Sequence, residues 1–241
     1  DTSASMQALD LDADVAISRR RTRLQVVKDV VGAFVERRPN DQLGMVVFGA
    51  EAFTQCPLTL DHDVFRTLLQ GVATGMAGDT TAIGSGLAAA SNRLRRSAAK
   101  SKVIVLLTDG SNNAGSLSPK RAAELSRALG IKVHTIGAAN RGKAPFLVNT
   151  ILGKEVHYGE FELDETTLKD IASITGGTYF RAEDSHALAD IYTKIDAMEK
   201  TDLKKQQFRE YEEHFAPLVW AALLLLLVET IGLQTRLRAY P

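Results

Sequence analysis

The sequence predicts an α/β protein in which a mostly parallel central sheet is covered by helices on both faces. Short apolar runs alternate with amphipathic segments along most of the chain, which is typical of this class. One run, residues 102–107 (KVIVLL), is continuously apolar, as expected of a strand buried on both faces. The composition agrees with a folded domain, because 45% of the 241 residues are hydrophobic and 24% are charged.

The first half of the chain provides the first elements of this alternation. An apolar stripe at helical spacing predicts a helix that ends at residues 39–41 (Pro-Asn-Asp). The stripe consists of Leu24, Val27, Val31 and Val35. The run at 43–48 (LGMVVF) predicts a strand closed by Gly49, and 52–58 predicts an edge strand. Helices are then expected over 64–72 and 83–94.

The second half continues the pattern from the strand at 102–107. A helix is expected over 119–129, with Ser118 as its N-cap and Gly130 just after its end. The remaining predictions are a strand at 131–136, a helix at 166–175, a short strand at 178–180 and a helix at 184–200. Residues 143–163 are the least regular part, and we expect a loop or a hairpin there.

The C-terminal end changes character abruptly. Residues 215–233 carry a single charge, Glu229, and as a helix they would be about 28 Å long, close to the hydrocarbon thickness of a bilayer. A buried core helix is the alternative, but the five-leucine run at 223–227 favours a transmembrane helix. The predicted organisation is therefore a globular domain at 1–199, a juxtamembrane connector at 200–214, a span at 215–233 and a tail at 234–241. Arg236 and Arg238 predict that the tail is cytoplasmic and the domain is on the other side.

Charge and cysteine content exclude several functions. Lys and Arg total 29 and Asp and Glu total 29, so the chain lacks the basic excess of a nucleic-acid-binding domain. The basic cluster at 19–23 is interpreted as the solvated start of a helix. Cys56 is the only cysteine and has no partner for a disulfide, and we interpret it as a small buried side chain.

Carboxylates and hydroxyls gather where a parallel sheet would bind a ligand, at the carboxyl ends of its strands. Asp109 directly follows the apolar run KVIVLLT, and Thr81 precedes a predicted helix in GDTTAIG. Asp1, Ser3 and Ser5 open the chain as D-T-S-A-S, and an extended turn would direct both serine hydroxyls to one side. Such an oxygen-only set suits a hard cation, Mg²⁺ above all, with Mn²⁺ or Ca²⁺ as alternatives.

These three pieces, in this order, resemble the metal-ion-dependent adhesion site of von Willebrand factor A (VWA) domains, which have a Rossmann-like fold. The resemblance covers residues 1 to 199. It implies that Ser3 and Ser5 bind the metal through their hydroxyls and that Thr81 binds directly or through water. It also implies that Asp1 and Asp109 hold coordinated waters, and that an acidic residue of a partner protein completes the metal's shell.

Longer segments, among them LGMVVFGAEAFTQCPLTLD and KVIVLLTDGSNNAG, are similar to the aerotolerance-operon class of bacterial VWA proteins. Those membrane-anchored proteins are encoded beside MoxR-type AAA+ ATPases. The resemblance implies a Mg²⁺-dependent interaction module without enzymatic activity, in a stress-tolerance or assembly complex that includes such an ATPase and other VWA proteins. It also implies the bacterial inner membrane as location, with the VWA domain on the periplasmic side.

The family's sheet order, 3-2-1-4-5-6, places a first, central strand before the metal motif. This sequence begins inside the motif, so the first strand is expected to be truncated.

Two other functions use similar residues. A Mg²⁺-dependent phosphotransferase also places an aspartate at the end of a first strand, but it usually carries a second aspartate two residues on, where this chain has Ser3. A VWA subunit of the metal-chelatase type shares the whole site and differs in its partner, so the sequence leaves that alternative open.

Overall fold

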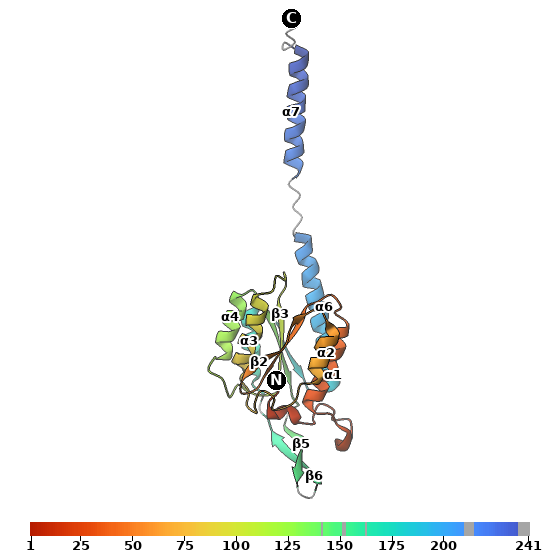
Figure 1. Ribbon diagram of the computed structural model, residues 1–241, viewed down its shortest axis with the longest axis vertical. Coiled ribbons are helices and arrows are strands. Elements are labelled where there is room, and N and C mark those ends of the chain that lie inside the picture. The colour runs from red at the N-terminus through yellow and green to blue at the C-terminus, as the bar shows by residue number, and fades with distance from the viewer. Residues whose placement is uncertain (141, 151–152, 162, 210–214, 236–241) are drawn as a thin grey trace. The chain divides into compact units, whose positions relative to one another are not determined.

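The computed structural model describes residues 1–140, 142–150, 153–161, 163–209 and 215–235 (Figure 1). The chain divides into two compact units, Asp1–Ala197 and Met198–Pro241. The first unit holds the sheet and the candidate site, and the second holds the end of one helix and all of another.

The predicted parallel sheet is present in the first unit. Its strands are β3 (Val103–Thr108), β4 (Lys132–Ala138) and β7 (Tyr179–Ala182), in the order β3-β4-β7, and both neighbouring pairs are parallel. A separate antiparallel pair is formed by β1 (Leu43–Phe48) and β2 (Ala52–Thr59). The α/β class and the parallel sheet predicted from the alternating pattern are therefore confirmed.

The first two residues of the chain lie between β1 and β3. The Thr2 nitrogen donates to the carbonyl of Phe48, at 2.8 Å, and the Asp1 nitrogen donates to the carbonyl of Leu107, at 3.3 Å. Within the described ranges no strand joins β1 to β3. Asp1 and Thr2 thus lie where the expected sheet order places the end of the first strand.

Helices cover both faces of the sheet, as predicted. On one face α1 (Arg23–Glu36) and the first turns of α6 (Ser185–Arg209) contribute Leu24 and Leu188 to one core cluster. On the other face α3 (Ile83–Arg95), α4 (Pro119–Ala128) and α5 (Glu165–Thr175) contribute to a second cluster. The helix α2 (His62–Gln70) packs against α1 and β2 in a third.

Local capping chemistry explains where these helices begin and end. Thr22 forms a capping box at the start of α1, and Ser118 caps α4 as the sequence predicted. Asp164 caps α5, and Gly176 ends it in the left-handed conformation that glycine adopts without strain.

The least regular segment of the sequence forms a β-hairpin. Strands β5 (Lys143–Thr150) and β6 (Gly153–Glu160) pair antiparallel and project from the end of the unit where the chain begins (Figure 1). Of the two alternatives expected for 143–163, the hairpin is the correct one. It belongs to neither of the other ladders.

The second unit contains the C-terminal helix α7 (Phe215–Thr235). Its side chains are described over 219–231, and its large apolar side chains there are exposed. Among the described residues, no helix is long and apolar enough to cross a membrane. This finding does not support the transmembrane helix expected over 215–233. Residues 200–209 of the expected connector continue α6, whereas its remainder and Arg236 and Arg238 of the tail lie outside the described residues.

Candidate metal site

The candidate site lies at the carboxyl end of β3. Thr108 ends this strand and Asp109 follows it, and both residues are fully buried. The chain start approaches the same point because Asp1 and Thr2 bond to neighbouring strands, and Ser3 then precedes a short 3₁₀ helix (Ala4–Gln7). The sheet therefore brings two segments together that lie a hundred residues apart in the sequence.

Four of the five predicted metal residues form one hydrogen-bonded cluster. The Ser3 nitrogen donates to Asp1 Oδ1 at 2.9 Å, and the Ser3 and Ser5 hydroxyl oxygens lie 3.0 Å apart. Ser5 Oγ donates to Asp109 Oδ1 at 2.7 Å. The two hydroxyls meet, as expected. The predicted extended turn is wrong at Ser5, because this residue lies in the 3₁₀ helix.

Thr81, the fifth predicted residue, lies against the loop that follows Asp109. Its nitrogen donates to Asn113 Oδ1 at 2.7 Å, and the Asn113 nitrogen donates to the Thr81 carbonyl at 3.0 Å. The Thr81 hydroxyl oxygen is 3.7 Å from the position that a Cβ on Gly110 would occupy. Among the described residues this hydroxyl has no hydrogen-bond partner, so its lone pairs are available to a cation or to water.

This set of oxygens fits a small hard cation. In an octahedral Mg²⁺ site with bonds of 2.0–2.1 Å, neighbouring ligand oxygens lie about 2.9 Å apart. The Ser3 and Ser5 hydroxyl oxygens have nearly this separation. Because Ser5 gives its proton to Asp109, its lone pairs can face a cation. In the described part of the chain no three His, Cys, Asp or Glu side chains gather into a metal cluster, so the hydroxyls would have to provide ligands.

Thr108 is a site residue that the sequence argument missed. Its hydroxyl donates to Asp1 Oδ2 at 2.5 Å, while the other oxygen of Asp1 accepts from the Ser3 nitrogen. Both carboxylate oxygens of Asp1 are thereby fixed in direction. The position of Thr108 immediately before Asp109, at the end of a buried strand, was the signal that could have identified this residue.

Arg23 corrects the interpretation of the basic cluster at 19–23 as a solvated helix start. Only 1% of Arg23 is exposed, and its guanidinium lies between two carboxylates. Nη1 donates to Asp109 Oδ2 at 2.7 Å, while Nε and Nη2 donate to the two oxygens of Asp10 at 2.7 and 2.6 Å. The Phe161 ring centroid is 5.3 Å from Cζ. Ion pairing on both sides offsets the cost of burying this charge.

The electrostatics of this network keep Arg23 charged. Burial by itself lowers the pKa of Arg23, but the hydrogen bonds to Asp10 and the charge of Asp109 outweigh it, and the pKa is raised above its ordinary value. The carboxylate of Asp109 is therefore shared between a serine hydroxyl and a permanent cation.

Cys56 does not belong to the site. It is 1% exposed, packs in the cluster around α2, and burial raises the pKa of its thiol. This environment agrees with the small buried side chain expected from the sequence and not with a reactive thiolate.

The family model of the von Willebrand factor type A domain matches residues 1–194. The chain belongs to this family. An uncharacterized protein of Borreliella burgdorferi is 26% identical to it over 230 residues, which is 95% of this chain and 65% of that relative. The chain thus spans slightly less than two thirds of the length of that relative.

Two solved structures of Bacteroides proteins are similar to this chain. The conserved hypothetical protein BatB of Bacteroides thetaiotaomicron has a TM-score of 0.68 at 26% identity, covering 83% of this chain and 95% of BatB. An aerotolerance-related membrane protein of Bacteroides fragilis has a TM-score of 0.65 at 26% identity, covering 80% and 93%. These matches confirm the resemblance inferred from the motifs.

A more distant structure shares the fold. Proximal thread matrix protein 1 from the mussel byssus has a TM-score of 0.58 at 23% identity, over 80% of this chain and 42% of that one. In that protein zinc occupies the metal-ion-dependent adhesion site.

Proposed function

We propose that this VWA chain is a membrane-anchored module that binds a protein partner through Mg²⁺. The ion would be held by Ser3, Ser5 and Thr81, with Asp1 and Asp109 in support. The observation that carries the proposal is the hydrogen-bonded cluster of Asp1, Ser3, Ser5 and Asp109 at the carboxyl end of β3. The occupied adhesion site of the mussel VWA protein supports a divalent metal at this position.

A bound Mg²⁺ would supply a positive centre that accepts an oxygen from an acidic residue of the partner. The residues of this chain prepare the position for it. Neutral hydroxyls of Ser3 and Ser5 face the site, while Thr108 and Arg23 fix the directions of the Asp1 and Asp109 carboxylates. Nothing in this arrangement requires turnover, so the proposed role is binding without catalysis.

Anchoring in the bacterial inner membrane is part of the proposal. The five leucines of α7 at 223–227 are 52% to 71% exposed, and lipid would cover them. The Bacteroides fragilis relative, described as an aerotolerance-related membrane protein, supports the same location. We place the VWA domain on the periplasmic side and the tail in the cytoplasm. The complex would contain other VWA proteins and a MoxR-type AAA+ ATPase and serve stress tolerance or assembly.

Calorimetric titration of Mg²⁺ into the full chain in detergent tests the metal site. We expect one binding site that Ser5→Ala weakens strongly, because this variant removes a ligand, whereas Ser116→Ala at an exposed position should bind like the wild type. A folded wild type that binds no Mg²⁺, or an unchanged affinity in Ser5→Ala, would contradict the proposal.

Co-purification tests the complex. A MoxR-type ATPase and VWA proteins from the same organism should be retained by the wild type in Mg²⁺ and released by a chelator. Retention that is equal with chelator, or equal for Ser5→Ala, would contradict a metal-dependent partner.

A further inference from the structure

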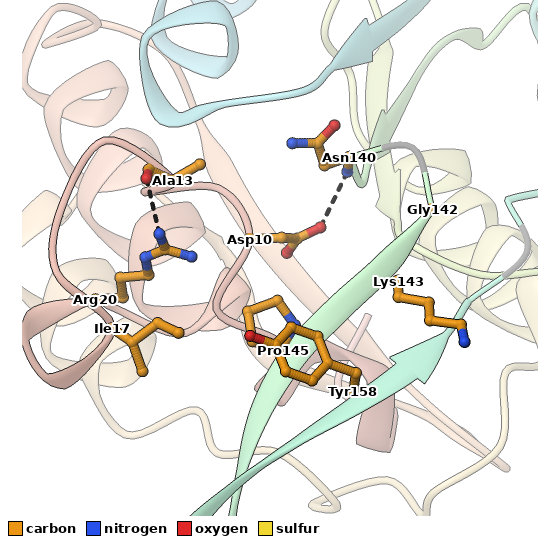
Figure 2. A pocket seen from close by; sticks show the side chains of 9 residues that line it. All are labelled: Asp10, Ala13, Ile17, Arg20, Asn140, Gly142, Lys143, Pro145 and Tyr158. Carbon is orange, nitrogen blue, oxygen red and sulfur yellow. Dashed lines mark hydrogen bonds between the residues drawn. The ribbon is translucent and has the colours of Figure 1, made fainter.

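A pocket of about 270 Å³ lies beside the candidate metal site, between the loop that precedes α1 and the base of the β5–β6 hairpin. Figure 2 shows Ile17 and Arg20 on the loop side and Pro145 and Tyr158 on the hairpin side.

Arg20 presents a fixed cation to this pocket. Its Nε and Nη2 donate to the carbonyls of Val15 and Ala13, both at 2.7 Å, and Nη1 donates to the carbonyl of Leu9 at 3.4 Å. These acceptors are neutral, and within the described residues no carboxylate pairs with Arg20. Since a guanidinium has five N–H donors, two remain for a ligand.

The acidic group in the pocket wall, Asp10, is already ion-paired. Both Asp10 oxygens accept from Arg23, and Oδ2 also accepts from the Asn140 nitrogen at 3.0 Å (Figure 2). Across the base of the hairpin, Lys143 lies opposite Glu160, so this pair adds little net charge. Arg20 is therefore the charge that determines which ligand the pocket prefers.

The hairpin adds an apolar surface that begins at the pocket. In its antiparallel register Pro145 faces Tyr158, and Leu147 faces Val156 two residues further out. Alternation along the strands places these four side chains on the same face. Tyr158 is 61% exposed, and Leu147 and Val156 are nearly 40% exposed, although a two-stranded sheet has little stability without a packed face.

The pocket and the metal site share their framework. Arg23 joins Asp10, in the pocket wall, to Asp109, in the metal cluster, so the two sites are separated by a single side chain. The Leu9 nitrogen donates to the carbonyl of Pro145 at 2.8 Å and attaches the loop to the hairpin. Since an extended chain advances about 3.3 Å per residue, a short segment can reach both sites.

We infer that this pocket and the apolar face of the hairpin bind an extended acidic segment of the same partner whose carboxylate completes the Mg²⁺ shell. One carboxylate of the segment pairs with Arg20, and an apolar side chain packs on Tyr158 and Pro145. This inference rests on the proposed function and adds the chemistry of the partner: at least two acidic residues with an apolar residue between them.

The probe is a fluorescein-labelled decapeptide that alternates aspartate with valine, and the same peptide with asparagine for aspartate is its control. Fluorescence anisotropy measures its binding to the full chain in detergent, with Mg²⁺ or with EDTA. We expect Arg20→Gln/Tyr158→Ser to weaken the aspartate peptide about tenfold or more, since a hydrogen bond to a charged group and an aromatic contact are lost. Arg121→Gln/Leu125→Ser removes an exposed arginine and an exposed apolar residue from α4 and should bind like the wild type.

Several results would overturn the inference. These are equal affinity of Arg20→Gln/Tyr158→Ser and the wild type, equal binding of the asparagine peptide, or no binding of the aspartate peptide at millimolar concentration. Binding of phosphatidylglycerol vesicles through Arg20 and Tyr158, without peptide binding, would identify a lipid surface instead. EDTA and Asp109→Ala separate the two proposals: if neither changes binding while Arg20→Gln/Tyr158→Ser does, the metal-dependent function fails and the pocket remains.

Discussion

Replacing Arg23 by methionine is the most direct test of the buried network. Methionine keeps much of the side-chain volume but leaves the Asp10 and Asp109 carboxylates buried without their cation. Among the described residues, Asp10 loses two of its three hydrogen bonds and keeps the one from the Asn140 nitrogen, and Asp109 keeps only the one from the Ser5 hydroxyl. Breaking a buried ion pair from one side costs about 3–5 kcal/mol, and here two carboxylates are affected. We expect a loss at the upper end of that range.

Urea unfolding of the full chain in detergent, with and without Mg²⁺, measures this effect. Urea leaves ion pairs unscreened, and Arg66→Met is the matched control because Arg66 is 43% exposed and pairs with Glu36 and Asp63, which are also exposed. Exposed pairs of this kind contribute little to stability. Mg²⁺ should stabilise Arg23→Met more than the wild type, because a cation beside Asp109 replaces part of the missing charge. Arg23→Met/Asp10→Asn should recover part of the loss.

Two outcomes would refute the reasoning. If Arg23→Met costs no more stability than Arg66→Met, the buried charges do not depend on the guanidinium. If the double variant is as unstable as Arg23→Met alone, the charge of Asp10 is not the source of the loss.

Three further predictions follow from the site and the fold. Asp109→Ala should lower Mg²⁺ affinity about 10- to 100-fold in calorimetry, because residues that orient metal ligands contribute this much, and an unchanged affinity would exclude Asp109. An apolar strand added before Asp1 should pair with β1 and β3 and raise the urea midpoint, since unpaired backbone groups are costly, and equal midpoints would contradict it. Hydrogen bonds from Thr167 hold the pKa of Asp164 below its ordinary value. The contribution of Asp164 to folding stability is therefore complete above about pH 4 and is lost as the pH falls through the pKa of the folded state. Asp164→Asn should reduce this loss of stability at acid pH and leave stability at pH 7 nearly unchanged, because asparagine also caps helices. An unaltered dependence of stability on acid pH would exclude Asp164 as the source of the loss.

The parts of the fold that the sequence predicted best are those with local causes. Ser118 identified the start of α4 because its hydroxyl accepts from the backbone three residues on. The apolar run of β3 marked a strand covered on both faces, and the two core clusters on either side of the sheet agree with it. The hairpin remained ambiguous because residues 144–148 (APFLV) are continuously apolar and so lack the alternation of a half-buried strand.

The candidate site was predictable in composition but not in its supporting contacts. Asp1, Ser3, Ser5 and Asp109 meet as their motif suggested. The role of Arg23 could not be read from its neighbours, because in sequence it belongs to a run of arginines. What distinguishes it is burial beside Asp109, which lies 86 residues away.

Charge balance connects the metal site with the pocket beside it. Asp1, Asp10, Asp109 and Arg23 together carry a formal charge of −2, from three carboxylates and one guanidinium. A divalent cation would bring this partly buried group to neutrality, which gives a physical reason for a cation to bind here. A partner carboxylate on the ion would then add one uncompensated negative charge. Arg20, fixed by backbone carbonyls and without a carboxylate partner among the described residues, lies on the pocket side of the same network and can balance an acidic partner segment. We therefore expect Arg20→Gln alone to weaken binding of the aspartate–valine peptide more at low salt than at high salt, in the presence of Mg²⁺, because salt screens this half-exposed charge.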